Sequence, residues 1–523
     1  MLGASDRSPP VRIRPEASPV PEENPPRHDP DPPPGSRDEV SPDAWLHFVG
    51  VGGSGMSALA QFHVGRGGRA TGSDRAFDQG ERAEIRAQLD AAGVQIVPQD
   101  GRALDTDCAA VVTSSAVESA IADVARAHEL GIPRRHRSEL LAVYVARHQT
   151  VAVTGTSGKS TVTAMIWTML HGNGVDPRLL TGGPVAALQA QGLLGNAYGG
   201  DRPSERPVLV IEADESDGSL VRYHPWLGVV LNLGRDHKEP AEVAAMFSEF
   251  RLHCGGPLVI GEDANLDFLR PGAVTFGLGD RADVRATDVV LGPRSVRFRV
   301  AGVPFTVPQP GRHTVLNALA AVAACRELGL PLASLAAPLA GFAGVARRFV
   351  SLGAAGGVEV IDDFAHNPDK LAAALATAHD RLRGTATATT DAGELTVTTG
   401  GAATGPRGRV LAVFQPHGYG PTRFLRDQLI ATFGEHLAPD DVLWLPEIFY
   451  AGGTVTRDIS SEHLVEAFAD AGREARFCPR REDLPALVAA EARPGDLVLV
   501  MGARDPSLTA LGHAILATLA AGG

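Results

Sequence analysis

Two glycine-rich turns, each set directly between a short apolar run and a helical pattern, most constrain the fold of this chain. The first turn, residues 50–55, follows the run 46–49 and has the spacing G-x-G-x-x-G. The second turn, residues 155–161, follows the run 150–154 and reads GTSGKST. A strand that ends in a glycine turn and continues as a helix is the building unit of parallel sheets. The two turns therefore predict an α/β fold with anion-binding loops at strand ends.

The same alternation of apolar runs and helical patterns continues along the chain in three blocks, residues 44–147, 148–341 and 342–523. A length of 523 residues suits about three domains of 100–200 residues each. We predict a Rossmann-like first domain, a central P-loop ATPase-like parallel sheet and a C-terminal Rossmann-like α/β domain.

Two segments lie outside this alternation. Residues 1–43 contain twelve prolines and almost nothing apolar, which is typical of a disordered tail. Residues 384–408 are rich in Thr, Gly and Ala, and they lie between a helical pattern (371–382) and an apolar run (409–414). We predict that they form a mobile insertion loop.

Composition narrows the class of protein. Hydrophobic residues make up 44% and charged residues 21%, and the net charge is −13 without any block of Lys and Arg. This balance argues against nucleic acid or an anionic membrane as a partner. No apolar run reaches the roughly 18 residues that span a bilayer, no signal-peptide core is visible, and the four cysteines have no paired spacing. We expect a cytoplasmic protein that is a monomer or a weak homodimer.

The first glycine turn is suited to a nucleoside diphosphate. Glycines let the backbone approach the diphosphate, whose charge faces the amides at the start of the following helix. Asp74, at the end of the run 69–73, is placed to accept a ribose hydroxyl. The motif alone fits NAD, FAD or another nucleoside diphosphate, and a purely structural turn is the alternative.

The second turn is suited to a nucleoside triphosphate. Its amides form an anion nest, Lys159 can reach the β- and γ-phosphates, and Ser160 or Thr161 can offer a hydroxyl to Mg²⁺. The apolar run 208–211 ends in the acidic residues of Glu-Ala-Asp-Glu-Ser-Asp (212–217), at the edge of the sheet where metal ligands are expected. The run 227–231 leads to Asn232 and then to Asp236 and His237, for which we predict a second metal or phosphate contact.

Further motifs resemble those of the Mur ligase family over about residues 45–511. The matching segments are 47–57, 114–116, 212–217, 311–313 with Asn317, 347–349, 362–368, 414–417 and 500–503. Within the family, they are most similar to members that add L-alanine to the lactyl carboxylate of UDP-N-acetylmuramate in peptidoglycan precursor synthesis. Members that attach a peptide in murein recycling are similar as well.

The resemblance implies a reaction and assigns roles. The first domain would bind the UDP-sugar, the second ATP with Mg²⁺, and the third the amino acid, and an acyl phosphate would be the intermediate. The implied UDP-sugar residues are Gly50, Gly52, Gly53, Gly55, Met56, Ser57, Ser73, Asp74, Ser114 and Ser115. The implied ATP residues are Gly155, Thr156, Ser157, Gly158, Lys159, Ser160, Thr161, Asn317, Arg348 and Asp363. The implied catalytic residues are Lys159, Glu212, His237, Arg348 and His366. Ser160, Glu212 and His237 would hold metal, and His417 and Arg423 would bind the amino acid.

The chain departs from the family pattern at several positions. Alanine-adding members carry His and Thr where this chain has Ser157 and Ser160, and a second His where it has Asn367. Two arginines that usually follow the histidine at 417 are replaced by Gly418 and Pro421. The identity of the added amino acid or peptide is therefore open, and an NAD-dependent oxidoreductase and a catalytically silent UDP-sugar sensor are the alternatives of other classes.

Overall fold

The described strands of this computed structural model form three sheets, of five, twelve and six strands, and most neighbouring strands within them run parallel. The structure describes residues 41, 43–202, 207–234, 238–390, 393–398, 408–450, 456–470, 472, 474–503, 505 and 507–522. His237 lies outside these residues, as does nearly all of the predicted tail 1–43. The predicted three-domain α/β fold is confirmed, while the domain boundaries remain a prediction.

The first sheet has the strand order β3-β2-β1-β4-β5, and all of its pairs are parallel. Its strands are β1 (Trp45–Val49), β2 (Arg69–Ser73), β3 (Val94–Ile96), β4 (Ala110–Thr113) and β5 (Arg134–His136). Its helices are α1 (Ser54–Gly65), α2 (Arg75–Asp78), α3 (Ala83–Ala91), α4 (Ala122–Leu130) and α5 (Arg137–Ala146). From β1 the chain adds β2 and β3 on one side of the strand and then β4 and β5 on the other, so the sheet has its topological switch point between β1 and β4. Ligands bind in the crevice at such a point, and the glycine turn after β1 lies there.

The second sheet has a parallel centre. Its main path runs β15-β14-β13-β12-β11-β10-β6-β9-β7-β8. The strands are β6 (Gln149–Thr154), β7 (Arg178–Leu180), β8 (Ala197–Tyr198), β9 (Val208–Glu212), β10 (Leu227–Val230), β11 (Leu258–Gly261), β12 (Val274–Gly277), β13 (Val284–Leu291), β14 (Val296–Val300) and β15 (Val303–Val307). The helices are α6 (Lys159–Gly172), α7 (Ala186–Gln189), α8 (Pro240–His253), α9 (Arg312–Glu327) and α10 (Ala336–Ala340). The central strands are mostly apolar and buried because helices cover both faces, whereas β14 alternates buried and exposed residues at the antiparallel margin.

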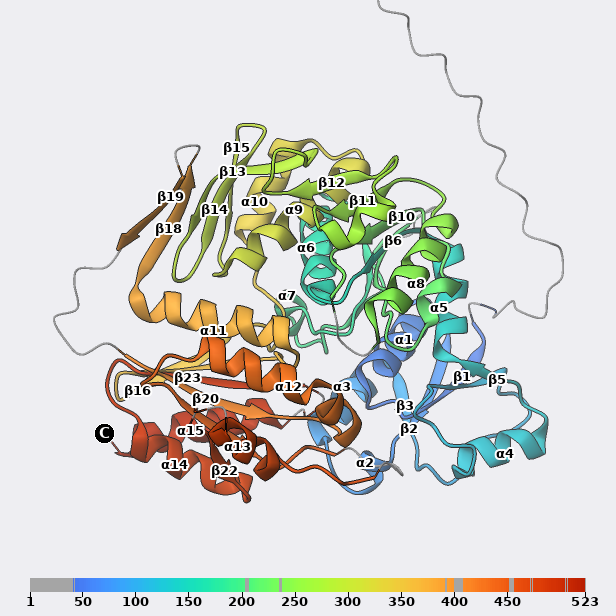
Figure 1. The fold of residues 1–523 in the computed structure, drawn as a ribbon. Coiled ribbons are helices and arrows are strands. Elements are labelled where there is room, and N and C mark those ends of the chain that lie inside the picture. Colours follow the sequence, from blue (N-terminus) through green and yellow to red (C-terminus); the bar gives the residue numbers. More distant parts are fainter. Residues whose placement is uncertain are drawn as a thin grey trace, which may run out of the picture. The chain divides into compact units, whose positions relative to one another are not determined.

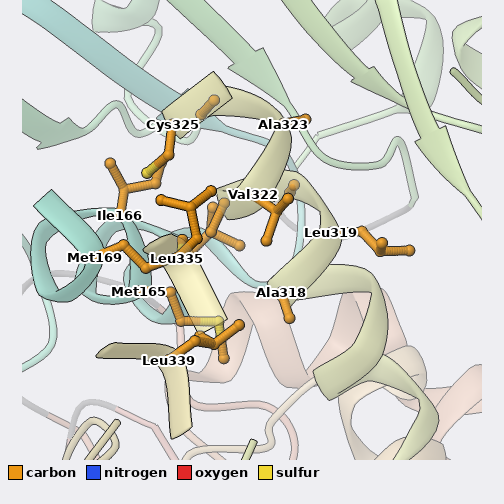
Figure 2. Close-up of a cluster of buried hydrophobic side chains, with 14 of the residues drawn as sticks. Met165, Ile166, Met169, Ala318, Leu319, Val322, Ala323, Cys325, Leu335 and Leu339 are labelled. Atoms are coloured by element: carbon orange, nitrogen blue, oxygen red, sulfur yellow. The ribbon is translucent and has the colours of Figure 1, made fainter. Parts of the chain in front are cut away.

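Helices α6 and α9 pack against each other on one face of this second sheet. Figure 2 shows Met165, Ile166 and Met169 of α6 facing Ala318, Val322 and Cys325 of α9, with Leu335 and Leu339 beside them. The small alanines of α9 let the two helices approach closely. This packing fixes the start of α6, where the phosphate loop ends.

The prediction of a loop at residues 384–408 is wrong for the part of this segment that the structure describes. Residues Thr385–Thr390 (β18) and Gly393–Thr398 (β19) form an antiparallel hairpin, and β18 pairs with β13 of the second sheet (Figure 1). Threonine is β-branched and favours extended backbone, which outweighs the loop-like composition.

The third sheet has the order β16-β17-β23-β20-β21-β22, antiparallel only at β16. Its strands are β16 (Val350–Ala355), β17 (Val358–Asp363), β20 (Val410–Gln415), β21 (Val442–Pro446), β22 (Arg476–Cys478) and β23 (Leu497–Gly502). Its helices are α11 (Pro368–Arg383), α12 (Tyr419–His436), α13 (Ser461–Asp470), α14 (Leu484–Glu491) and α15 (Leu508–Gly522). Helices α11, α12 and α13 cover one face of the sheet, and α14 and α15 cover the other (Figure 1).

No helix among these described residues is long and apolar enough to cross a membrane.

Candidate active site

The phosphate loop connects β6 to α6 in a conformation that only glycine tolerates at two positions. Gly155 and Gly158 have φ angles of +132° and +90°, in the region that L side chains rarely adopt. A Cβ on Gly158 would also lie 2.5 Å from Oδ1 of Asn317. The loop therefore turns tightly into the N-terminus of α6, where backbone N–H groups favour an anion.

Asn232, which follows β10, holds the loop in place. Its Oδ1 accepts hydrogen bonds from Oγ1 of Thr156 (2.8 Å) and from the amide of Ser157 (2.9 Å). Its Nδ2 donates to the carbonyl of Ser157 at 3.0 Å. The sequence predicted Asn232 at this edge of the sheet. It did not predict the hydrogen bonds to the loop, because they join residues 75–76 positions apart.

Lys159 is paired with the acidic residues that follow β9. Its Nζ lies 2.8 Å from Oε2 of Glu215 and 3.7 Å from Oδ1 of Asp214. Burial alone would lower the pKa of Lys159, but the carboxylates of Glu215, Asp214 and Glu212 raise it above its usual value. Lys159 therefore carries a positive charge into the cavity at neutral pH.

Glu212 and Ser160 both lie close to the turn formed by Thr181, Gly182 and Gly183. Oε2 of Glu212 accepts from Oγ1 of Thr181 (3.0 Å) and from the amide of Gly182 (2.7 Å). A Cβ on Gly183 would lie 3.1 Å from Cβ of Ser160, so the turn passes close to both side chains.

The hydroxyl and carboxylate oxygens of Ser160 and Glu212 fit Mg²⁺, which takes few protein ligands and completes its shell with water and phosphate oxygens. No cluster of three or more His, Cys, Asp or Glu side chains suited to a metal occurs within the described ranges. The predicted contribution of His237 falls outside those ranges.

The segment 347–349 places arginines against the end of β17. Arg347 and Phe349 have φ angles of +57° and +53°, which is uncommon for residues other than glycine. Arg347 is held by Asp362 (3.3 Å) and by the carbonyls of Gly502 (2.7 Å) and Asp505 (2.9 Å). These contacts hold the strained turn from which the next side chain, that of Arg348, projects into the cavity.

Arg348 and Asp363 are half-buried and carry opposite charges that attract each other. The guanidinium of Arg348 lies 4.7 Å from the ring centre of Phe364. The carboxylate of Asp363 accepts from the amides of Phe349 and Ala365, each at 2.7 Å. Burial raises the pKa of Asp363 to about 6, and Arg348 and these two amides oppose the shift.

These parts meet in two cavities. A cavity of about 660 Å³ is lined by Ser54 of the first glycine turn, Ser157–Ser160 of the phosphate loop, Glu212, Arg348, His366 and His417, with other residues. A cavity of about 560 Å³ is lined by the phosphate loop, Asn317, Arg348 and Asp363, among others. All the predicted ATP residues except Gly155 therefore line one or both of these cavities. Gly155 contributes through the backbone conformation of the loop. Lys370, which was not predicted, lines both cavities.

The first glycine turn adopts the predicted strand–turn–helix setting, with Gly50 at φ +76°. Both carboxylate oxygens of Asp74 are used by backbone amides, those of Gly52 and Ala76, each at 2.9 Å. Ser73 is buried and donates to Asp123 rather than facing the turn. Gly53 is the N-cap of α1, Gly55, Met56 and Ser57 lie in its first turn, and Ser114 and Ser115 follow β4 at the same edge of the sheet. A ribose contact by Asp74 remains a prediction.

The two predicted amino-acid residues are placed differently. His417 is buried and lines the larger cavity, with its ring 5.2 Å from that of His366. Arg423 is 46% exposed, pairs with Asp458 and does not line either cavity. Its role in binding an amino acid remains a prediction.

Known proteins match this chain along most of its length. Residues 46–149 match the model of the Mur ligase family catalytic domain, 153–325 the Mur ligase middle domain, and 385–504 the Mur ligase glutamate ligase domain. The UDP-N-acetylmuramate–L-alanine ligase of Streptomyces avermitilis is 36% identical over 489 residues, which cover 90% of this chain and 96% of that protein. The protein of the same name from Geobacter sulfurreducens is 33% identical over 494 residues, covering 91% and 97%.

A solved structure has the same fold. The crystal structure of the UDP-N-acetylmuramate–alanine ligase of Thermotoga maritima aligns with a TM-score of 0.71 and 25% identity, covering 91% of this chain and 99% of that one. Three domain models matched in order, together with this identity over most of the length, show that the chain belongs to the Mur ligase family.

Proposed function

We propose that the protein is an ATP-dependent ligase that joins L-alanine to the lactyl carboxylate of UDP-N-acetylmuramate, a step of peptidoglycan precursor synthesis. One observation carries the proposal: the larger cavity is lined by Ser54 of the first glycine turn, by the phosphate loop, by Glu212 and by the buried residues His366 and His417. A UDP-sugar, ATP and an amino acid can therefore reach one another. The alanine ligases to which the chain is 33–36% identical support this choice of substrates.

ATP would lie with its phosphates on the loop 155–161 and its base toward Asn317. Lys159, released from Glu215 by the competing phosphate, would neutralise charge on the γ-phosphoryl group as it transfers. Ser160 and Glu212 would hold Mg²⁺, which when bound supplies further charge neutralisation at the phosphates. Arg348 would add a third positive group from the third domain.

The reaction would then run in two steps. A carboxylate oxygen of the sugar attacks the γ-phosphorus, its bond to ADP breaks, and an acyl phosphate forms. The amine nitrogen of the amino acid attacks the acyl carbon, loses a proton, and expels inorganic phosphate with the carboxylate oxygen. The residues of the cavity contribute mainly by positioning the reactants and by stabilising charge.

A ligase that attaches a peptide is the second candidate. Gly418 stands at the start of α12, immediately after the cavity residue His417, and Pro421 follows within its first turn. Neither offers the positive charge that the family pattern places there, so the carboxylate of the incoming group would be held differently. A peptide with a more distant carboxylate could use Arg423 instead.

The reactants and the cysteines both support a cytoplasmic location. All four cysteines are free thiols, as is usual in a reducing compartment. We further propose that the enzyme acts on small molecules only and works as a monomer or weak homodimer.

A phosphate-release assay with UDP-N-acetylmuramate, ATP and Mg²⁺ tests the proposal when it is run against a panel of amino acids and murein peptides. We expect release with L-alanine far above the rate without it. Release that depends on a tripeptide and not on alanine would favour the second candidate, and release with neither would refute ligation of this sugar.

A further inference from the structure

Arg137 lies where the first glycine turn meets the acidic segment of the second domain. It is the first residue of α5, and its Nη2 is 2.5 Å from Oδ2 of Asp217. A Cβ placed on Gly55 would be 3.1 Å from Nη1 of Arg137. The guanidinium is therefore packed directly against the turn, and the absence of a side chain at Gly55 provides the room.

Asp217 is held so that it can orient this guanidinium. Its Oδ1 accepts a hydrogen bond from the amide of Ser219 at 3.0 Å. The two side chains are largely enclosed, with 23% of Arg137 and 14% of Asp217 exposed. An enclosed, charge-assisted contact of this kind has a defined geometry, unlike a pair of flexible surface side chains.

Asp217 also belongs to the acidic segment that contacts the phosphate loop. In this segment Glu215 pairs with Lys159, and two residues later Asp217 pairs with Arg137. The same segment thus orients one cation at the ATP loop and another at the UDP-sugar turn. Ser54, next to Gly55, lines the same cavity as Lys159.

Two carboxylates lie close to the turn, so a cation there would favour the binding of a diphosphate. The carboxylate of Asp74 already occupies the amide of Gly52 and brings a negative charge to the turn. Asp217 adds a second negative charge nearby. A positive group in contact with the turn reduces the repulsion that a diphosphate would meet from these two carboxylates, and Arg137 is such a group.

We propose that Arg137 binds the diphosphate of the UDP-sugar and that Asp217 is the positioning residue that holds Arg137 over the glycine turn. This inference rests on the proposed function, because it takes a UDP-sugar as the ligand of the turn.

Calorimetry with UDP-N-acetylmuramate and with UDP tests the inference. We expect Arg137→Ala to weaken the binding of both ligands at least about tenfold, since a charge-assisted contact is lost. Arg137→Lys should restore part of the affinity. Asp217→Asn should cause a smaller loss, and combining it with Arg137→Ala should add nothing. In steady-state kinetics, the KM for the UDP-sugar should rise with little change in the KM for ATP.

Arg222→Ala is the matched control. Arg222 pairs with Glu139 of α5 at 3.4 Å and so links the same two segments, but both side chains are about half exposed and neither touches the glycine turn. An affinity loss in Arg137→Ala no greater than in Arg222→Ala would overturn the inference and leave the Arg137–Asp217 pair as a link between domains.

The remaining outcomes also distinguish the possibilities. Loss of UDP-sugar binding with unchanged UDP binding would place Arg137 on the sugar or its carboxylate and refute the diphosphate contact. If Arg137→Ala does not fold, the Lys and Asn variants still give the comparison. A wild-type protein that binds no UDP-sugar would count against the proposed function, whereas normal binding that Arg137→Ala does not weaken would overturn only this inference.

Discussion

The ammonium group of Lys159 lies 2.8 Å from the carboxylate of Glu215, at the base of the cavity that the phosphate loop shares with the third domain. The carboxylate keeps the lysine charged, and the same ion pair keeps it close to where the phosphates of ATP would bind. The acidic segment is therefore part of the phosphate site even where it does not contact a metal.

Lys159→Ala should lower turnover by about 100-fold or more, because the charge on the transferring phosphoryl group loses a preorganised partner. Binding of UDP-N-acetylmuramate should stay within about threefold of wild type, since the glycine turn belongs to another domain. ADP release and calorimetry measure the two quantities. Equal losses of UDP-sugar affinity and turnover would contradict the assignment of Lys159 to ATP.

Glu212→Gln should raise the Mg²⁺ concentration for half-maximal activity by about tenfold or more, because a charged ligand is lost. Glutamine keeps an oxygen that can accept from Thr181 and Gly182, so the turn should stay intact. A titration of activity against Mg²⁺, with the melting temperature as a check on folding, measures this. A lower maximal rate with an unchanged Mg²⁺ dependence would remove Glu212 from the metal site.

Arg423→Ala should raise the KM for the amino acid by about tenfold or more, as expected for the loss of a charge-assisted contact with a carboxylate. Arg426→Ala is the control, because Arg426 is a similarly exposed arginine on α12 that pairs with Asp427. The KM values for ATP and the UDP-sugar should change little in either variant. If the two variants behave alike, Arg423 is a surface residue whose exposed pair with Asp458 contributes little to stability or binding.

His148 should make the folded protein sensitive to acid. Its Nε2 accepts from Arg66 and Arg178, each at 2.7 Å, and burial together with these two charges lowers its pKa from 6.5 to about 4. The unfolded chain binds the proton more readily, so the contribution of His148 to stability is complete above pH 6.5. This contribution, at most roughly 3 kcal/mol of unfolding free energy, is lost as the pH falls from 6.5 toward 4. In His148→Gln, the loss of unfolding free energy between pH 7 and pH 5 should be smaller than in wild type. An identical pH dependence would contradict this.

Local patterns predicted much of the site, and long-range contacts account for the rest. The loops at residues 50–55 and 155–161 and the carboxylates after β9 could be read directly, because strand, turn and helix are adjacent in sequence. The bracing of the phosphate loop by Asn232 and the contact of Arg137 with Asp217 join residues about 75–80 positions apart, and no spacing rule reveals them. The hairpin of Thr385–Thr390 and Gly393–Thr398 was not predicted because the Thr, Gly and Ala composition of 384–408 indicated a loop, although Leu395 and Val397 alternate with threonines as in a strand.

The central claim, that ATP activates the carboxylate of a UDP-sugar, is tested most directly by following oxygen. UDP-N-acetylmuramate with ¹⁸O in its lactyl carboxylate is incubated with the enzyme, ATP, Mg²⁺ and L-alanine, and the released phosphate is analysed by mass spectrometry. The account predicts that each inorganic phosphate carries one oxygen from the carboxylate, because that oxygen leaves with phosphorus when the amide forms. Amide product accompanied by unlabelled phosphate would contradict it.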